Sequence, residues 1–287
     1  MNIPRSIRSH KIQLGDVNVH YVTAGDEDAP PLLMLHGWPQ SWLEWALIIP
    51  ELAKHFRIIA PDLRGMGDST APKSGYDAKT VALDHVRLLD HLNISAVKLV
   101  AHDVGTLGAY ALAAGHRERV TALAMLDTQL PGFSLDNIVQ PGPEGWGMWH
   151  IPLHASPMGE LLITGKEPEY LTWFLRAMAY NPFGVPQAHA DEYIRAFRAP
   201  GAKRNLGHYG ALYDNGLYFR ELASKKLAIP VLGVGGSASL GTRVGEEMAR
   251  VAERVVTDVA PECGHWIPEE QPDWTAQRLI RFFTKVE

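Results

Sequence analysis

The stretch Leu99-Val100-Ala101-His102-Asp103-Val104-Gly105 decides the fold of this chain. Its first residues end a short apolar run that starts at Val97, and its last residues open a run of small side chains that reaches Gly115. A buried strand that turns directly into a helix of small residues is the pattern of a nucleophile elbow, in which the central side chain stands clear of the backbone. The sequence therefore predicts a sharp strand–turn–helix with Asp103 at its centre.

The residue at the centre of this elbow is a carboxylate, whereas the common version of the motif has a serine. A carboxylate needs no deprotonation before it attacks, and its attack on an sp³ carbon gives an alkyl ester. Asp103 could also be no more than the N-cap of the following helix. The choice between these two roles depends on which other residues accompany it.

Strand and helix patterns alternate on both sides of the elbow. Strands are expected over residues 17–22, 31–35, 56–60, 97–101, 120–126, 229–234 and 254–259, and helices over 42–54, 80–92, 104–115, 244–252 and 272–284. Strands that alternate with helices predict an α/β fold, a doubly wound and mostly parallel sheet with helices on both faces.

The alternation stops at about residue 130 and resumes near residue 219. The interval 131–218 holds 13 of the 25 Phe, Trp and Tyr residues, together with several prolines and helical patches. Residues 1–130 and 219–287 are therefore expected to form the core, and 131–218 an inserted helical cap. Its aromatic side chains suit either an ordinary helical core or a lid that lines an apolar pocket.

Composition excludes several classes of protein. Of the 287 residues, 46% are hydrophobic and 21% are charged, which is typical of a globular chain. The net charge of −5 argues against nucleic acid or an anionic membrane as a partner, and one cysteine, Cys263, allows no disulfide and no thiolate metal site. No apolar stretch has the length of a membrane span, and the first 13 residues have no apolar run typical of a signal peptide. A cytoplasmic location is expected, although secretion stays open for a longer precursor.

Two further motifs supply the partners that a nucleophile needs. The turn His36-Gly37-Trp38-Pro39 follows a buried strand, so the backbone N–H of Trp38 could join that of Val104 in an oxyanion hole. His265, in Cys263-Gly264-His265-Trp266, follows the last strand, where a general base belongs. The chain order of nucleophile, acid and histidine favours catalysis over a structural role for His265.

The acid that would orient His265 is expected at the end of a core strand. The loop Gly235–Gly241 follows one such strand but contains no carboxylate. Asp127 ends the preceding core strand and is the preferred candidate, with Asp258 and Glu246 as weaker alternatives. Asp127 could otherwise be a simple turn residue.

With these motifs in place, nearly the whole chain resembles the α/β-hydrolase family, and within it the epoxide hydrolases. The resemblance rests on the four motifs His36–Trp42, Asp62–Ser69, His102–Gly105 and Gly264–Trp266. It implies that an epoxide is opened to a vicinal diol through an ester on Asp103, with a small apolar epoxide and water as partners. It implies no cofactor and no metal, and it is compatible with a homodimer.

The resemblance also extends to the cap. Trp149-His150 resembles the cap signature of a secreted bacterial branch of these enzymes, in which a histidine and a tyrosine assist ring opening. This implies that His150 and Tyr209 are the donors, with Tyr213, Tyr180 and His154 as alternatives. Trp149 and Trp266 are expected to contact substrate. The missing signal peptide departs from that secreted branch.

Two families of dehalogenases also have this fold and an Asp nucleophile. The haloalkane dehalogenases place a tryptophan directly after the nucleophile, and the fluoroacetate dehalogenases an arginine, whereas this chain has Val104 there. A serine hydrolase fits poorly, because Gly235-Gly236-Ser237-Ala238-Ser239 only imitates an elbow. A non-catalytic binding protein on this fold would require Asp103 and His265 to be relics.

Overall fold

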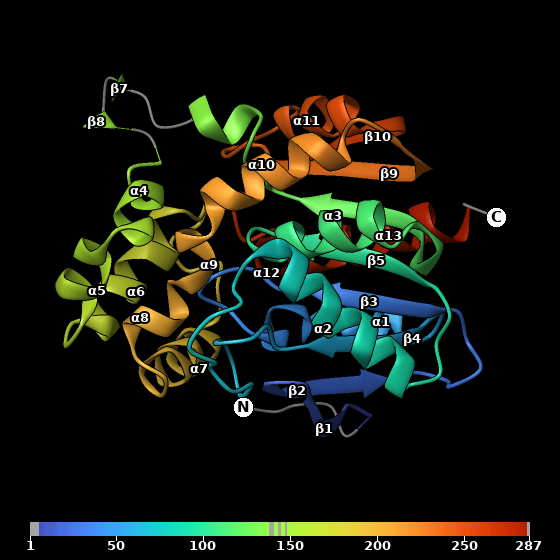
Figure 1. The fold of residues 1–287 in the computed structure, drawn as a ribbon, viewed down its shortest axis with the longest axis horizontal. Helices are drawn as coiled ribbons and strands as arrows, with labels where there is room; N and C mark the ends of the chain where they lie inside the picture. Colours follow the sequence, from blue (N-terminus) through green and yellow to red (C-terminus); the bar gives the residue numbers. More distant parts are fainter. Residues whose placement is uncertain (1–5, 138–140, 143–144, 147, 286–287) are drawn as a thin grey trace.

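A single eight-stranded sheet forms the centre of the molecule (Figure 1). The computed structural model describes residues 6–137, 141–142, 145–146 and 148–285. The strands are β1 (Arg8–Leu14), β2 (Val17–Ala24), β3 (Pro31–Leu35), β4 (Arg57–Pro61), β5 (Val97–His102), β6 (Val120–Leu126), β9 (Leu227–Gly236) and β10 (Ala252–Ala260), in the spatial order β1-β2-β4-β3-β5-β6-β9-β10. A separate two-stranded ribbon pairs β7 (Pro141–Gly142) with β8 (Gly145–Trp146).

Seven strands of this sheet run in the same direction, and β2 runs opposite to them. β1 pairs antiparallel with β2, and β2 pairs antiparallel with β4. From β4 through β3, β5, β6 and β9 to β10, every pairing is parallel. The expected α/β class with a mostly parallel sheet is confirmed. Because parallel strands end at the same edge, the residues that follow β3, β5, β6 and β9 are brought together.

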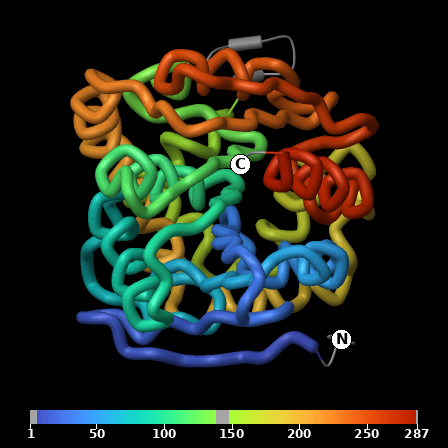
Figure 2. The backbone as a smooth tube through the Cα atoms, turned by 90° about the vertical axis from the view of Figure 1, so that its right-hand side faces the viewer, coloured from blue at the N-terminus to red at the C-terminus, as the bar shows by residue number. Residues whose placement is uncertain are grey.

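Helices cover both faces of this sheet. All helices of the described residues, in chain order, are α1 (Ile49–Leu52), α2 (Ala78–His91), α3 (Gly105–Gly115), α4 (His150–Ala155), α5 (Pro157–Ile163), α6 (Glu167–Ala177), α7 (Gln187–Arg198), α8 (Ala202–Asn205), α9 (Gly207–Gly210), α10 (Leu212–Leu222), α11 (Arg243–Val251), α12 (Ile267–Glu270) and α13 (Pro272–Thr284). Figure 2 shows the teal and green α2 and α3 on one side and the red α13 on the other. In the described part of the chain, no helix combines the length and apolar character needed to cross a membrane.

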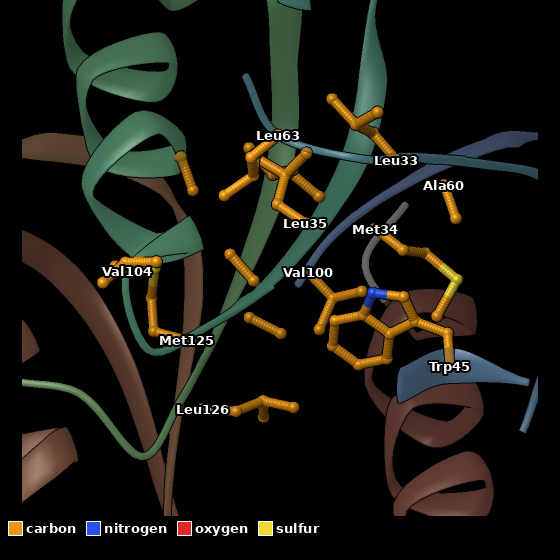
Figure 3. Packing of buried hydrophobic residues seen from close by; sticks show 14 of the residues in the cluster. Leu33, Met34, Leu35, Trp45, Ala60, Leu63, Val100, Val104, Met125 and Leu126 are labelled. Atoms are coloured by element: carbon orange, nitrogen blue, oxygen red, sulfur yellow. The ribbon is translucent and has the colours of Figure 1, made fainter. Parts of the chain in front are cut away.

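The sheet interior is a continuous apolar core. Leu33 and Leu35 on β3 and Met125 on β6 are fully buried on one face of the sheet, and Met34 on β3 and Val100 on β5 are fully buried on the other (Figure 3). A strand that is covered on both faces needs apolar side chains at nearly every position, which explains why these segments read as unbroken apolar runs in the sequence. Each such residue stabilises the fold by about 1.5–3 kcal/mol relative to an exposed side chain.

Two segments differ from the sequence prediction. The helix expected over residues 42–54 is divided into the 3₁₀ turn η1 (Trp42–Trp45) and the short α1. Its apolar spacing is helical, but Ser41 caps a tight turn and Pro50 lies inside the second segment. β1 was not predicted, because most of its side chains are exposed and its strand character comes from pairing with β2.

The helices α4 to α9, here called the cap helices, lie at one end of the sheet (Figure 1). They pack mainly on one another, with α4 against α5 and α9, and α6 against α7. α10 continues from them back to the core and contacts α3. It spans residue 218, so the boundary expected between 218 and 219 lies within a helix. The division into core and cap remains a prediction.

The elbow between β5 and α3 is tightly constrained. β5 ends at His102 and α3 begins at Gly105, which leaves Asp103 at a left-handed φ of 47°. A Cβ atom on Gly105 would lie 2.5 Å from the carbonyl oxygen of His36 and 2.7 Å from that of Leu35. Only a glycine allows α3 to approach β3 this closely, so the small residue that the motif requires has a direct steric cause.

Replacing this glycine with alanine tests the constraint. We expect Gly105→Ala to lower the free energy of unfolding by about 1–3 kcal/mol, the usual cost of overpacking. The cause is a clash with backbone atoms of the neighbouring strand, which cannot rotate away. Urea unfolding followed by far-UV circular dichroism measures the change.

Gly210→Ala is the matched control, because no atom lies within 4 Å of a Cβ built at that helical glycine. We expect it to keep or slightly raise the unfolding midpoint, since alanine favours helix over glycine. A Gly105→Ala variant as stable as the wild type would contradict the packing argument.

Candidate active site

A small cavity lies between the carboxyl ends of the parallel strands and the cap helices. Its volume is about 60 Å³. The lining residues are Trp38, Asp103, Val104, Leu107, Asp127, Thr128, Gln129, Leu135, Met148, His150, Ile151, Phe174, Met178, Tyr209, Leu212, Leu240 and His265. Most of these side chains are apolar. The titratable residues among them are Asp103, Asp127, His150, Tyr209 and His265, all of which the sequence predicted at the site.

Asp103 presents its carboxylate to this cavity. Its side chain is 22% exposed, and its Oδ1 accepts a hydrogen bond of 2.8 Å from the backbone N–H of Trp38. The N-terminus of α3 begins two residues later, and its dipole favours a negative charge at this position. One carboxylate oxygen is therefore held, while Oδ2 has no protein donor among the hydrogen bonds of the described residues.

His265 lies between two carboxylates. Its Nδ1 is 2.6 Å from Oδ2 of Asp127, and its Nε2 is 3.7 Å from Oδ2 of Asp103. An ionised carboxylate can only accept, so Nδ1 carries the proton and Nε2 is left with a lone pair. The distance of 3.7 Å is too long for a hydrogen bond, so this lone pair is free to accept a proton beside the Asp103 carboxylate.

Asp127 is fully buried and accepts hydrogen bonds at both oxygens. Oδ1 accepts from the backbone N–H groups of Gly236 at 2.9 Å and Leu240 at 3.3 Å, and Oδ2 accepts from the hydroxyl of Ser239 at 2.6 Å. Burial alone would raise the pKa of Asp127. The hydrogen bond and charge of His265, with those from Ser239 and Gly236, outweigh burial and lower it. This carboxylate is stabilised in its ionised form.

The sequence does not show the role of the loop Gly235–Gly241, which contains no carboxylate. It supplies donors to Asp127 rather than an acid. The alternative acids lie elsewhere: Asp258 pairs with Arg278 on the edge strand β10, and exposed Glu246 bonds Thr242 within the first turn of α11. Neither lines the cavity.

His150 and Tyr209 line the same cavity as Asp103 and belong to the cap helices. His150 begins α4 and Tyr209 lies on α9, and both are buried and line the cavity. Burial lowers the pKa of His150 to about 4, so its ring is neutral near pH 7. Burial, then the charge of Asp103, raises the pKa of Tyr209 well above 10. Both groups therefore remain neutral hydrogen-bond donors.

The alternative donors in the cap do not line the cavity. Tyr180 is 53% exposed and Tyr213 is 76% exposed. His154 is buried, but its Nε2 lies 2.6 Å from the hydroxyl of Tyr170 and its ring packs against Trp38 and Tyr209.

The two tryptophans expected to contact substrate also lie away from the cavity. Trp149 is 39% exposed and packs against Trp173 on the outer side of the cap helices. Trp266 is fully buried, and its indole N–H donates to the carbonyl oxygen of Leu175 at 2.7 Å. Trp266 therefore ties the loop of His265 to α6.

The described residues contain no group of three or more His, Cys, Asp or Glu side chains arranged to hold a metal ion. Cys263 is buried beside the His265 loop, and burial raises the pKa of its thiol.

Comparisons with known proteins identify the family. The model of a family described as "Epoxide hydrolase N terminus" matches residues 3–45, and one described as "alpha/beta hydrolase fold" matches residues 30–149. A soluble epoxide hydrolase of Corynebacterium sp. (strain C12) is 37% identical, over 96% of this chain and 97% of that protein. The chain belongs to the epoxide hydrolase branch of the α/β-hydrolase family.

Two further relatives of this chain extend the comparison. The crystal structure of Cfl2 from Burkholderia cenocepacia has a TM-score of 0.93 and 40% sequence identity, covering 98% of this chain and 97% of that chain. A fluoroacetate dehalogenase from Burkholderia sp. is 27% identical over 95% of this chain and 92% of that protein. The family expected from the sequence motifs is confirmed, and this dehalogenase is less similar to the chain than the Corynebacterium epoxide hydrolase.

Two buried histidines on α4 should make the stability of the fold depend on pH. His150 and His154 have pKa values lowered by burial to about 4 and about 2, whereas the unfolded chain binds protons near 6.5. Below about pH 6.5 the unfolded state therefore binds protons that the folded state does not, and each histidine removes up to about 1.4 kcal/mol per pH unit. We expect the free energy of unfolding to fall between about pH 7 and pH 5.

His154→Phe should make this fall less steep, because it removes one buried imidazole and keeps an aromatic ring in the same packing. Urea unfolding at several pH values measures the slope. His91→Gln is the matched control, since His91 lies on the exposed end of α2 and no buried group is lost. Equal slopes for His154→Phe and the wild type would refute the assignment.

Proposed function

We propose that this protein is an epoxide hydrolase that opens a small apolar epoxide to a vicinal diol through an alkyl ester on Asp103. The observation that carries the proposal is the cavity geometry. The Asp103 carboxylate, with Oδ1 bound to Trp38 N–H at 2.8 Å, shares one cavity with the neutral donors His150 and Tyr209. Membership of the epoxide hydrolase branch supports the same reaction.

In the first step Oδ2 of Asp103 attacks a ring carbon. A new C–O ester bond forms and the ring C–O bond breaks, so the negative charge moves from Asp103 to the departing alkoxide. Tyr209 gives its phenolic proton to this alkoxide, and His150 donates a second hydrogen bond. The charge of Asp103 raises the pKa of Tyr209 beside the effect of burial, so formation of the neutral ester makes the phenol more acidic when its proton is needed.

In the second step water hydrolyses the ester. Nε2 of His265 accepts a proton from water, which attacks the ester carbonyl carbon, and Asp127 stabilises the imidazolium. The oxyanion that develops on Oδ1 is held by the N–H of Trp38, joined by that of Val104 at the start of α3. Collapse of the tetrahedral intermediate breaks the ester C–O bond, and the imidazolium of His265 protonates the departing oxygen to give the diol. The remaining proton of the water, left on the carboxyl of Asp103, returns to the phenolate of Tyr209, which restores the Asp103 carboxylate and the phenol.

The lining of the cavity supports an apolar substrate. Leu107, Leu135, Ile151 and Phe174 line it and present apolar surface to a substrate. We infer that the helical segment 131–218 acts as the cap that excludes bulk water, since it contributes both ring-opening donors.

The second step can be tested by trapping the ester. In His265→Gln we expect the ester to form and persist, because no base remains to activate water. Intact-protein mass spectrometry after mixing with propylene oxide should show a mass increase equal to one epoxide. Asp127→Asn should also slow ester hydrolysis, because His265 loses the carboxylate that stabilises its charged form.

Asp103→Ala combined with His265→Gln is the control and should show no adduct. An adduct that persists without Asp103, or diol formation that is unaffected by His265→Gln, would exclude this mechanism.

The choice between epoxide and halide chemistry depends on the donors. A leaving alkoxide needs an acidic group, whereas a halide needs only N–H dipoles or cations. Among the described lining residues, Trp38 carries the only indole, and the Nε1 atom of this indole is fully buried. None of these lining residues carries a guanidinium group. We therefore expect Tyr209→Phe to keep the fold and to slow epoxide opening by roughly 10²–10⁴-fold.

Diol formation and halide release should be measured on the same preparations. Exposed Tyr213→Phe is the matched control and should keep wild-type activity. Fluoroacetate, chloroacetate and a chloroalkane should release negligible halide. Rapid fluoride release without diol formation from any epoxide would favour a dehalogenase instead.

A further inference from the structure

A buried acid and a buried base meet directly behind the candidate active site. Glu44 lies in the 3₁₀ turn η1, and His102 is the last residue of β5, next to Asp103. Both side chains have no exposed surface, and Oε1 of Glu44 lies 3.2 Å from Nδ1 of His102. Neither residue lines the cavity or has a part in the two steps above.

The hydrogen bond of Nε2 and the carboxylate that faces Nδ1 together favour a charged His102 ring. Its Nε2 lies 2.9 Å from the carbonyl oxygen of His265, which can only accept, so Nε2 carries a proton. If the ring were neutral, the Nδ1 lone pair would face a buried carboxylate. A second proton on Nδ1 removes this repulsion and gives Glu44 the counter-charge that a buried carboxylate needs.

The surrounding charges agree with this assignment. Burial alone would lower the pKa of His102, but Glu44, with smaller contributions from Asp103 and Asp127, raises it to about 9. The groups that face His102 are Glu44 from η1, Asp103 from the elbow, Asp127 from the end of β6 and the ring of His265, whose centroid is 4.6 Å away. His102 is the cation among three carboxylates.

The pair connects the three segments that carry the candidate site. Oε2 of Glu44 accepts a hydrogen bond of 2.8 Å from the N–H of Gly37, which precedes Trp38. His102 precedes Asp103 in the chain and holds the backbone of His265. We propose that Glu44 and the imidazolium of His102 are positioning residues, which keep the Trp38 N–H and the His265 ring in register with Asp103.

This role rests on the proposed function and concerns its second step most. Ester hydrolysis needs the oxyanion donor and the base together, whereas the attack of Asp103 needs neither His265 nor a developed oxyanion. Loosening the pair should therefore slow hydrolysis of the ester more than its formation. As a result kcat and KM should fall together, and kcat/KM should change little.

The charge state of His102 can be measured without any substrate. In ¹⁵N NMR of the histidine-labelled wild-type protein near pH 7, we expect both ring nitrogens of His102 to carry protons. In Glu44→Gln, which keeps an acceptor for the Gly37 N–H but removes the charge, one proton should be lost. A neutral His102 ring in the wild type would overturn the proposal.

The kinetic test uses Glu44→Gln with propylene oxide in single-turnover mixing. We expect the rate of ester formation to stay within about twofold of the wild-type rate and the rate of ester hydrolysis to fall by about tenfold. This fall is smaller than the one that follows removal of an oxyanion donor, because the Trp38 N–H is displaced and not deleted. Asp84→Asn is the matched control, because it removes the carboxylate of another buried pair, Arg64–Asp84, whose side chains contact none of these segments. It should leave both rates unchanged.

Equal slowing of both steps, or no slowing, in Glu44→Gln would overturn the positioning role. If the wild-type protein forms no diol from any epoxide, the proposed function fails, and the NMR measurement still decides whether the buried ion pair exists.

Discussion

The close approach of α3 to β3 is the constraint on which the candidate site depends. Because Gly105 has no side chain, the first turn of α3 lies against the carbonyl groups of Leu35 and His36. This contact brings the elbow beside the turn after β3, so the N–H of Trp38 meets the carboxylate of Asp103 at 2.8 Å. A residue held at a left-handed φ of 47° projects its side chain away from both elements and into the cavity. The position of Asp103, its backbone donor and its exposure to the cavity therefore have one steric origin.

The sequence predicted those parts of the fold and site whose causes are local. The strands β3, β5 and β6 are buried on both faces, so unbroken apolar runs mark them, and Asp103, Asp127 and His265 follow strands that share one edge. β1 could not be predicted, because its pairing with β2 creates the strand and its own side chains are mostly exposed. Likewise, apolar spacing in 42–54 could not show where helical turns would be interrupted.

The residues that support the site are placed by contacts between segments that lie far apart in the sequence. Ser239 and Gly236 bind Asp127 because a loop without any acid folds back over the end of β6. Glu44 meets His102 only when η1, β5 and the His265 loop are packed together, and no spacing in the sequence marks such a contact. The sequence shows where carboxylates are that could react. It does not show the hydrogen-bond donors that would determine which of these carboxylates reacts.

The two carboxylates that flank His265 show this difference clearly. Asp127 accepts from two backbone N–H groups, a hydroxyl and the imidazole, so its lone pairs are occupied and its charge is stabilised where it lies. Asp103 has one backbone donor and keeps Oδ2 open toward the cavity. The same functional group therefore has the surroundings that suit the proposed orienting acid in one setting and the proposed nucleophile in the other.

The neutrality of the cap donors follows from the same reasoning. A cationic side chain in place of His150 or Tyr209 would form an ion pair with Asp103 before substrate binds, and it would make the carboxylate a weaker nucleophile. Burial keeps the His150 ring uncharged and the Tyr209 phenol protonated, so neither group neutralises Asp103. Both can still donate when negative charge moves to the alkoxide, because a neutral donor interacts most strongly with the charge that develops during the reaction. The cation that this site does contain, His102, lies behind the nucleophile and is paired with Glu44, where it balances the buried charge without covering the face that attacks.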